Sequence, residues 1–216
     1  RDRTTKILQP LELVCVDMDG PRSTPTLSMR GSPYRYAMMI RDHSTRYTAV
    51  FLLRDLQQSK VAAKMEEYFN GMYAALGSIP KRIRADNDCF KAEATQEMLR
   101  RRGVAYEPSN PYEQWQNGSA EKAIQDMNSY ARAMSLGEYA PRGFDLWAVK
   151  MAAYRYSHMP NAKIGGRMPV VALLGYFGKS TKDVTLAAVE KAICVPFAPV
   201  TYNITRRFKN EKSSPA

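Results

Sequence analysis

The sequence has few of the residues that build disulfide frameworks or structural zinc sites. Its 216 residues include three cysteines, Cys15, Cys89 and Cys194, and two histidines, His43 and His158. An odd number of widely spaced cysteines does not indicate a disulfide-stabilised scaffold. A structural zinc site takes four Cys or His ligands, usually in closely spaced pairs. The sequence therefore argues against both kinds of small, cross-linked domain.

Long apolar runs are also missing. No stretch approaches the roughly 20 apolar residues that a membrane-spanning helix requires, and the N-terminal RDRTTKILQP does not resemble a signal peptide. Apolar residues nevertheless make up 44% of the chain, and at this length one domain with a sizeable core can form. We expect a soluble globular protein with no membrane partner.

Acidic residues are scarce relative to basic ones. The chain has 21 Asp and Glu against 32 Lys and Arg, a net charge of +11 and a pI near 9.6. Such a balance favours a polyanionic partner, through phosphate contacts that are sensitive to salt and have little sequence preference. A basic surface without a specific partner is the alternative that charge alone leaves open. The basic residues cluster at Lys81-Arg82-Arg84, Arg100-Arg101-Arg102 and Arg206-Arg207-Lys209.

Hydrophobic periodicity predicts a chain in which strands and helices alternate. Residues 1–10 are expected to be a linker, and the segment from about 184 mixes short apolar pieces with turns before a basic tail. The expected strands are 11–16, 34–40, 47–53, 81–85 and 104–106. The expected helices are 58–76, 92–102, one from about 119, and 144–158. Segments rich in turn residues predict a hairpin connection over 41–46 and loops over 20–33 and 109–118.

The helix expected from about Ser119 has two distinct faces. A solvated surface is the simplest interpretation of its polar face, and periodicity alone favours that interpretation. The apolar face carries Ala120, Ala123, Ile124, Met127, Ala131 and Met134. The opposite, polar face carries Glu121, Gln125, Asn128 and Arg132 at positions i, i+4, i+7 and i+11.

Three acidic residues stand where a predicted strand ends or a helix begins. Asp17 lies in VCVDMDGP, Asp86 in IRADND, and Glu121 in PYEQWQNGSAEKAI. Acids on separate elements suit two divalent metal ions, because Mg²⁺ and Mn²⁺ prefer oxygen ligands. A metal pair about 4 Å apart can clamp both oxygens of an in-line phosphoryl transfer. Asp19 competes with Asp17, since side chains two apart on a strand face the same way, and Asp88 competes with Asp86.

These stretches together resemble the catalytic core of retroelement integrases, closest to the copia-type (Ty1/copia) retrotransposon branch. The resemblance runs from about residue 11 to 178 and is carried by LELVCVDMDGP, YRYAMMIRDHSTRYTAVFLL, IRADND, PYEQWQNGSAEKA and YRYSHMPNAKIGGRMPVVALLGYFGK. It implies an α/β fold of the ribonuclease-H-like type, a five-stranded mixed sheet flanked by helices, with a C-terminal extension. Residues 1–10 would then be a linker, 11–140 the catalytic core, 141–178 its C-terminal helices, and 179–216 the extension with its basic tail.

The resemblance also implies roles for the site residues. Asp17, Asp86 and Glu121 match the DDE metal ligands, and the recurring Asp-x-x-Gly-Pro favours Asp17 over Asp19, which becomes a turn acid. This chain departs from the family after Asp86, where Asn87-Asp88-Cys89 replaces the usual Asn-Gly and following glycine. The family carries a zinc domain before the core, so we expect this chain to be a fragment of a longer product. The implied DNA contacts, on the active-site loop and the following helix, are Tyr112, Gln114, Gln116, Asn117, Lys122, Gln125, Asn128 and Arg132.

The implied function is that of a DDE-type polynucleotidyl transferase, an integrase that trims the 3′ ends of element DNA and joins them to target DNA. Its cofactor would be Mg²⁺ or Mn²⁺, and its partners would be duplex DNA and further copies of the same chain. The resemblance places that activity in the nucleus. Two alternatives stay open: a domesticated integrase-derived protein that binds DNA without catalysis, and a ribonuclease-H-like nuclease.

Overall fold

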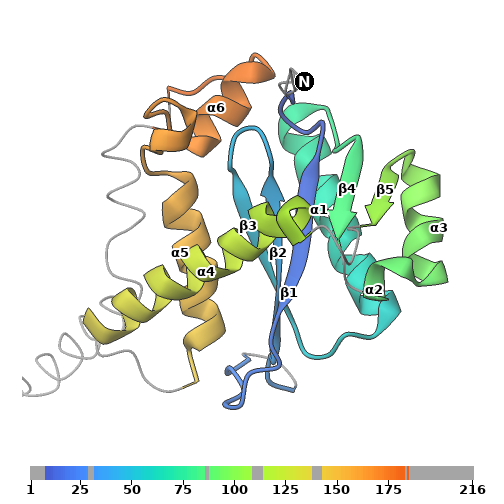
Figure 1. The fold of residues 1–216 in the computed structure, drawn as a ribbon, viewed down its shortest axis with the longest axis vertical. Coiled ribbons are helices and arrows are strands. Elements are labelled where there is room, and N and C mark those ends of the chain that lie inside the picture. Colours follow the sequence, from blue (N-terminus) through green and yellow to red (C-terminus); the bar gives the residue numbers. More distant parts are fainter. Residues whose placement is uncertain are drawn as a thin grey trace, which may run out of the picture.

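One five-stranded mixed sheet carries helices on both faces (Figure 1). The computed structural model describes residues 8–28, 32–85, 88–108, 114–137, 143–182 and 184. The strands are β1 (Val14–Asp19), β2 (Tyr36–Asp42), β3 (Thr48–Leu53), β4 (Arg82–Ala85) and β5 (Ala105–Pro108). The helices are α1 (Gln58–Leu76), α2 (Asp88–Lys91), α3 (Glu93–Arg102), α4 (Gln114–Gly137), α5 (Asp145–Ser157), the 3₁₀ turn η1 (Ala162–Ile164) and α6 (Pro169–Tyr176). None of the described helices is long and apolar enough to cross a membrane.

The sheet has the order β3-β2-β1-β4-β5. The first three strands in sequence form an antiparallel meander, whereas β4 and β5 lie parallel to β1. Parallel neighbours need a crossover connection, usually a helix. Here α1 lies between β3 and β4 in the chain, and α3 lies between β4 and β5. This arrangement confirms the expected α/β fold of the ribonuclease-H-like type.

Alternation along β1 divides its side chains between two hydrophobic cores. Val14 and Val16 are fully buried in the core formed with α1 and α3, and Met18 packs against that core. The intervening residues, including Asp17, therefore face the other side of the sheet, where α4 and α5 pack over β2 and β3. The sheet thus turns Asp17 toward α4.

The first strand begins and ends later than the sequence predicted. β1 spans Val14–Asp19, so Asp17 lies inside the strand and not after it. Leu11 has a positive φ of 59° and belongs to a turn. The Leu11 N–H donates to the buried Asp42 carboxylate at 2.8 Å, which fixes this turn and delays the strand. Pairing with β2 then continues as far as Asp19 opposite Ala37.

The helix that carries Glu121 begins earlier than predicted. α4 starts at Gln114, so residues 114–118 are helical and are not part of the expected loop. The Asn117-Gly118 pair had indicated a turn, since Gly inside a helix costs about 1 kcal/mol relative to Ala. Packing of the helix on the sheet outweighs that cost, because Ala123 and Met127 are completely buried against the second core. The hairpin connection is also shorter than expected, since β2 continues to Asp42.

Candidate metal centre

α4 packs across β1 and β2, and side-chain contacts at two points tie it to the sheet. The Arg46 guanidinium donates to the Ser119 hydroxyl at 3.0 Å, and the Asn128 amide donates to the Asp19 carboxylate at 3.0 Å. Glu121 lies between these two points on α4 and is exposed, while Asp17 lies on the face of β1 against which α4 packs.

The two described acids differ in their surroundings. Asp17 is half-buried, and its Oδ1 accepts the Met18 N–H at 2.7 Å. Glu121 is exposed and makes no hydrogen bond or ion pair with the described part of the chain. The exposed Glu121 carboxylate is open to a metal ion, and carboxylate oxygens are the ligands that Mg²⁺ and Mn²⁺ prefer.

Asp86, the third predicted ligand, lies outside the described residues. β4 ends at Ala85, and its parallel register pairs Arg84 with Cys15. The end of β4 therefore lies beside the middle of β1, and Asp86 is the next residue in the sequence. Among the described residues, which leave out Asp86, no group of three His, Cys, Asp or Glu is placed to hold a metal ion. The chemistry of the predicted donor set, three carboxylates, fits a divalent metal, and the assignment of these ligands stays a prediction.

Asp19, the competing acid on β1, is committed to protein contacts. Its Oδ2 accepts hydrogen bonds from the Arg22 guanidinium and from the Asn128 amide nitrogen. Arg22 also donates to the Asn128 side-chain oxygen at 2.6 Å. These three residues form a network that ties the end of β1 to α4. This use of Asp19 favours Asp17 as the metal ligand.

The polar face of α4 is only partly free for DNA. Gln125 and Arg132 are exposed, and Lys122 is exposed with its Nζ 3.0 Å from Asp126. Asn128 is half-buried, and both polar atoms of its amide are already bonded. Four further predicted contacts lie outside the described part of the chain: Tyr112 and the side chains of Gln114, Gln116 and Asn117. The DNA contacts stay predictions.

Sequence reasoning missed a buried arginine beneath α4. Arg41 is 2% exposed, and burial lowers the pKa of its guanidinium. Nε donates to the Thr48 hydroxyl at 3.0 Å, and Nη1 lies 3.5 Å from the Ser119 carbonyl. The guanidinium also lies over the Tyr156 ring, at 4.9 Å from its centroid. Its nearest acid in the described chain is Asp126, at 3.8 Å.

Arg41 and a second arginine together hold the second turn of α4. Arg46 donates to the Ser119 hydroxyl at 3.0 Å, while Arg41 approaches the Ser119 carbonyl. Ser119 stands two residues before Glu121, so this contact positions the helical turn that carries the acid. The sequence offered only a polar hairpin motif at these positions, and nothing in that motif signals burial under a helix.

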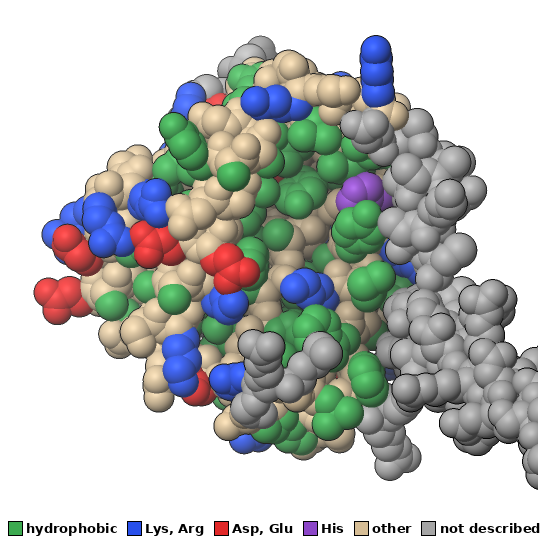
Figure 2. Space-filling model, turned by 180° about the vertical axis from the view of Figure 1, so that it is seen from behind, with side chains coloured by type: hydrophobic (Ala, Val, Ile, Leu, Met, Phe, Trp, Pro, Cys, Tyr) green, Lys and Arg blue, Asp and Glu red, His purple; other side chains and the backbone are tan. Residues whose placement is uncertain are grey.

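Two of the three basic clusters are largely neutralised within the fold. Arg82 and Arg84 both pair with Glu107 on β5. The α3 cluster pairs with Glu66 on α1, through Arg101 and Arg102, while Arg100 pairs with Glu97. Figure 2 shows red and blue side chains interleaved over the side of the molecule where α1 and α3 lie. The third cluster, 206–209, lies outside the described residues.

The chain is similar to known proteins in its structure, whereas comparisons of its sequence find no match. No family model matches the chain, and no curated protein matches it. Among solved structures it is similar to the HTLV-2 integrase catalytic core domain in complex with magnesium, in its trimeric form, with a TM-score of 0.55 and 13% identity over 76% of this chain and 96% of that one. It is also similar to the BIV integrase catalytic core domain, with a TM-score of 0.57 and 16% identity over 76% of this chain and 95% of that one. The chain has the fold of a retroviral integrase catalytic core.

The integrase-core fold recurs in a larger assembly. The chain is similar to a protein in the simian T-cell lymphotropic virus intasome, which was solved in complex with the PP2A regulatory subunit B56 gamma. That match has a TM-score of 0.60 and 13% identity, and covers 76% of this chain but 54% of the other. At such identities the likeness concerns the fold, and site chemistry has to be argued from residues.

Proposed function

We propose that this chain is the catalytic core of a DDE-type polynucleotidyl transferase, an integrase of the copia type. It would trim the 3′ ends of element DNA and join them to target DNA in the nucleus. The observation that carries the proposal is the position of two acids in an integrase-core fold. Asp17 on β1 faces α4, Glu121 is an exposed acid of α4, and Asp86 directly follows β4 in the sequence.

Asp17, Asp86 and Glu121 would hold Mg²⁺ or Mn²⁺. The HTLV-2 core was solved with magnesium, which supports the same cofactor here. When bound, the metal would stabilise the negative charge that develops during phosphoryl transfer and lower the pKa of water or of a DNA 3′-hydroxyl. No nucleophilic side chain is required.

The surrounding side chains keep the acids in place. The network of Asp19, Arg22 and Asn128 holds α4 against the end of β1. Arg41 and Arg46 hold the preceding turn of α4 through Ser119. Exposed cations and amides beside Glu121 would contact DNA phosphates: Lys122, Gln125 and Arg132.

The proposed partners are duplex DNA and further copies of the chain. The net charge of +11 supports the first partner. For the second, the HTLV-2 core is trimeric and the simian virus protein belongs to an intasome. A cavity of about 540 Å³ between the edge strand β3 and α5 also has aromatic walls, from Tyr47, Phe51, Trp147 and Tyr154. Aromatic residues are typical of protein–protein contact surfaces.

A joining assay on branched DNA tests the proposal. A branched duplex already contains the joined strands, so attack of a labelled 3′-hydroxyl on the branch point runs the transfer in reverse and needs no knowledge of the element ends. We expect a longer labelled strand with Mg²⁺ or Mn²⁺, and none with EDTA or with a 3′-deoxy end. A ribonuclease-H-like nuclease would give shorter strands without joining. A domesticated DNA-binding protein would leave the strands unchanged, and either result would refute the integrase assignment.

A further inference from the structure

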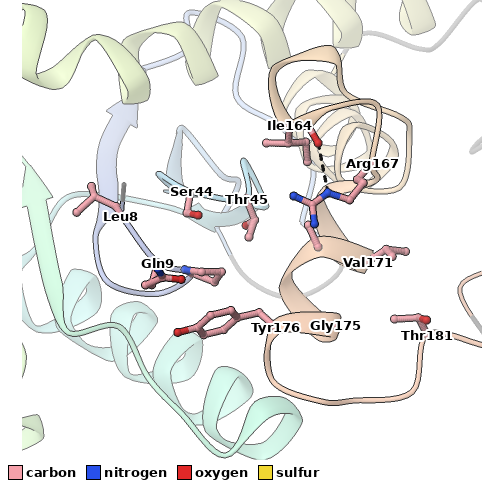
Figure 3. Close-up of a pocket in the computed structure, with 12 residues that line it drawn as sticks. Leu8, Gln9, Ser44, Thr45, Ile164, Arg167, Val171, Gly175, Tyr176 and Thr181 are labelled. Atoms are coloured by element: carbon pink, nitrogen blue, oxygen red, sulfur yellow. Dashed lines mark hydrogen bonds between the residues drawn. The ribbon is translucent and has the colours of Figure 1, made fainter. Parts of the chain in front are cut away.

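A polar cavity lies at the end of the sheet where β1 begins, and neither Asp17 nor Glu121 lines it. It has a volume of about 580 Å³ and separates residues 8–10 and the β2–β3 turn from η1 and α6 (Figure 3). Its polar lining includes Gln9, Ser44, Thr45, Arg167 and Thr181, and none of its lining residues is acidic. Asp42 lies behind Thr45, fully buried, and its carboxylate accepts the Thr45 N–H and hydroxyl.

Arg167 is the cation that this cavity offers to a ligand. Its Nε donates to the Ile164 carbonyl at 3.4 Å, which leaves its two terminal nitrogens without an acceptor among the described residues. Figure 3 shows the guanidinium turned toward the side of the cavity where Ser44 and Thr45 lie. The Ser44 hydroxyl also has no hydrogen-bond partner in the described chain. A guanidinium fork with a hydroxyl opposite suits a phosphate group.

The Lys and Arg residues of this part of the chain are mostly without an acidic partner among the described residues. Between Leu146 and Lys182 the sequence contains six Lys and Arg and no Asp or Glu. Four of them form no ion pair with any described residue: Arg167, which lines the cavity, and Lys163, Lys179 and Lys182, which stand within two residues of lining residues in the sequence. The arginines of α3 and β4, by contrast, are paired with glutamates. Cations without acidic partners attract an anionic ligand, and here Arg167 lines a cavity of about 580 Å³ that has room for a phosphate group.

The β2–β3 turn connects this cavity to the candidate metal centre. Ser44 and Thr45 line the cavity, and the next residue, Arg46, donates to the Ser119 hydroxyl at 3.0 Å. Ser119 precedes Glu121 by two residues on α4. A duplex presents one phosphate charge per about 1.7 Å of its axis, so DNA that lies on the metal centre and extends past this turn brings phosphates to the cavity.

We propose that the cavity between the β2–β3 turn and α6 binds a backbone phosphate of duplex DNA, with Arg167 as its main contact. The Ser44 hydroxyl donates a second hydrogen bond, and Lys163, Lys179 and Lys182, near the lining residues in the sequence, add long-range attraction. The assignment rests on the proposed function, because it takes duplex DNA as the substrate. It adds a DNA contact outside the metal centre, on the opposite side of the β2–β3 turn from Ser119.

DNA binding by Arg167→Gln, measured over a range of salt concentrations, tests this assignment. The probe is a short fluorescent duplex in EDTA, so that no chemistry occurs. Arg100→Gln is the matched control, because it also removes one exposed arginine charge but from an ion pair on α3. We expect Arg167→Gln to weaken binding and to reduce the log–log salt slope by about 1, as for one lost phosphate contact. Arg167→Lys should keep the slope, and Arg100→Gln should behave as the unchanged protein.

Two outcomes overturn the proposal in distinguishable ways. If Arg167→Gln keeps both the affinity and the slope of Arg100→Gln while the unchanged chain binds DNA, the cavity assignment is wrong and the proposed function stands. If the unchanged chain binds DNA with no salt dependence, the DNA-directed function is itself wrong. Equal melting temperatures of the Arg167 and Arg100 variants establish that the comparison concerns binding and not folding.

Discussion

Replacement of Asn128 by Ala separates a structural role on α4 from a direct contact with DNA. The Asn128 oxygen accepts a hydrogen bond from Arg22 at 2.6 Å, and its nitrogen donates to Asp19 at 3.0 Å. Both partners are charged, and both are only partly exposed. The side chain therefore acts as the link between the end of β1 and α4.

The expected loss can be worked out from these two contacts. A hydrogen bond to a charged group contributes about 1.5–3 kcal/mol, but Asp19 and Arg22 keep their own ion pair and water can reach both. We therefore expect the Asn128→Ala substitution to lower the free energy of unfolding by about 2 kcal/mol. The matched control is Gln125→Ala, one turn earlier on the same face, where the exposed side chain makes no described contact. That change should stay within about 0.5 kcal/mol.

Urea unfolding of the two variants measures the difference. With a slope of roughly 2 kcal/mol/M, the midpoint of Asn128→Ala should fall by about 1 M while the slope itself is unchanged. DNA joining by this variant should decline no more than its stability explains. If Asn128→Ala unfolds at the same urea concentration as Gln125→Ala and yet loses joining, Asn128 contacts DNA and the structural role is wrong.

Three further outcomes are expected. Met127→Ala should lower the free energy of unfolding by about 2–5 kcal/mol, because Met127 is completely buried between α4 and the sheet. Urea unfolding measures this loss, and a value below about 1 kcal/mol would contradict the packing. Gly20→Ala should cost more than about 1 kcal/mol, since Gly20 has a φ of +123° and an added Cβ would lie 2.6 Å from the Arg35 carbonyl oxygen; an unchanged melting temperature would contradict that geometry. Cys15 is completely buried, and desolvation raises the pKa of its thiol to about 11. In a variant whose other two cysteines are serine, alkylation at pH 8 should therefore be slow until the protein unfolds, and fast labelling of the folded protein would count against the position of α4 over β1.

Elements with a strong apolar period could be predicted from the sequence. α1 has the expected bounds, 58–76, because one face carries buried residues such as Val61, Met65 and Phe69 and because Gly77 takes the left-handed conformation that ends the helix. The start of α4 could not be predicted in this way. Gly118 is a typical turn residue, and only packing of later residues on the sheet makes it helical.

Side-chain contacts between residues far apart in the chain could not be predicted from the sequence. The motifs indicated which elements carry Asp17 and Glu121, but they gave Asp19 no partner, and Asn128 stands 109 positions away from it. The clustered arginines of α3 looked free for DNA, yet they pair with Glu66 from another helix. Hydrophobic periodicity indicates which residues share a helix, a strand or one of its faces. Which side chains form hydrogen bonds and ion pairs depends on how the helices and strands pack.

DNA joining by single ligand variants tests the central claim most directly. Asp17→Asn, Asp86→Asn and Glu121→Gln should each abolish metal-dependent joining on the branched duplex while the melting temperature hardly changes, because each removes a charged metal ligand with little change in shape. Asp19→Asn should still join DNA but melt lower, since it weakens the contacts to Arg22 and Asn128. If any of the three ligand variants joins DNA at the rate of the unchanged protein, the assignment of the metal centre is wrong.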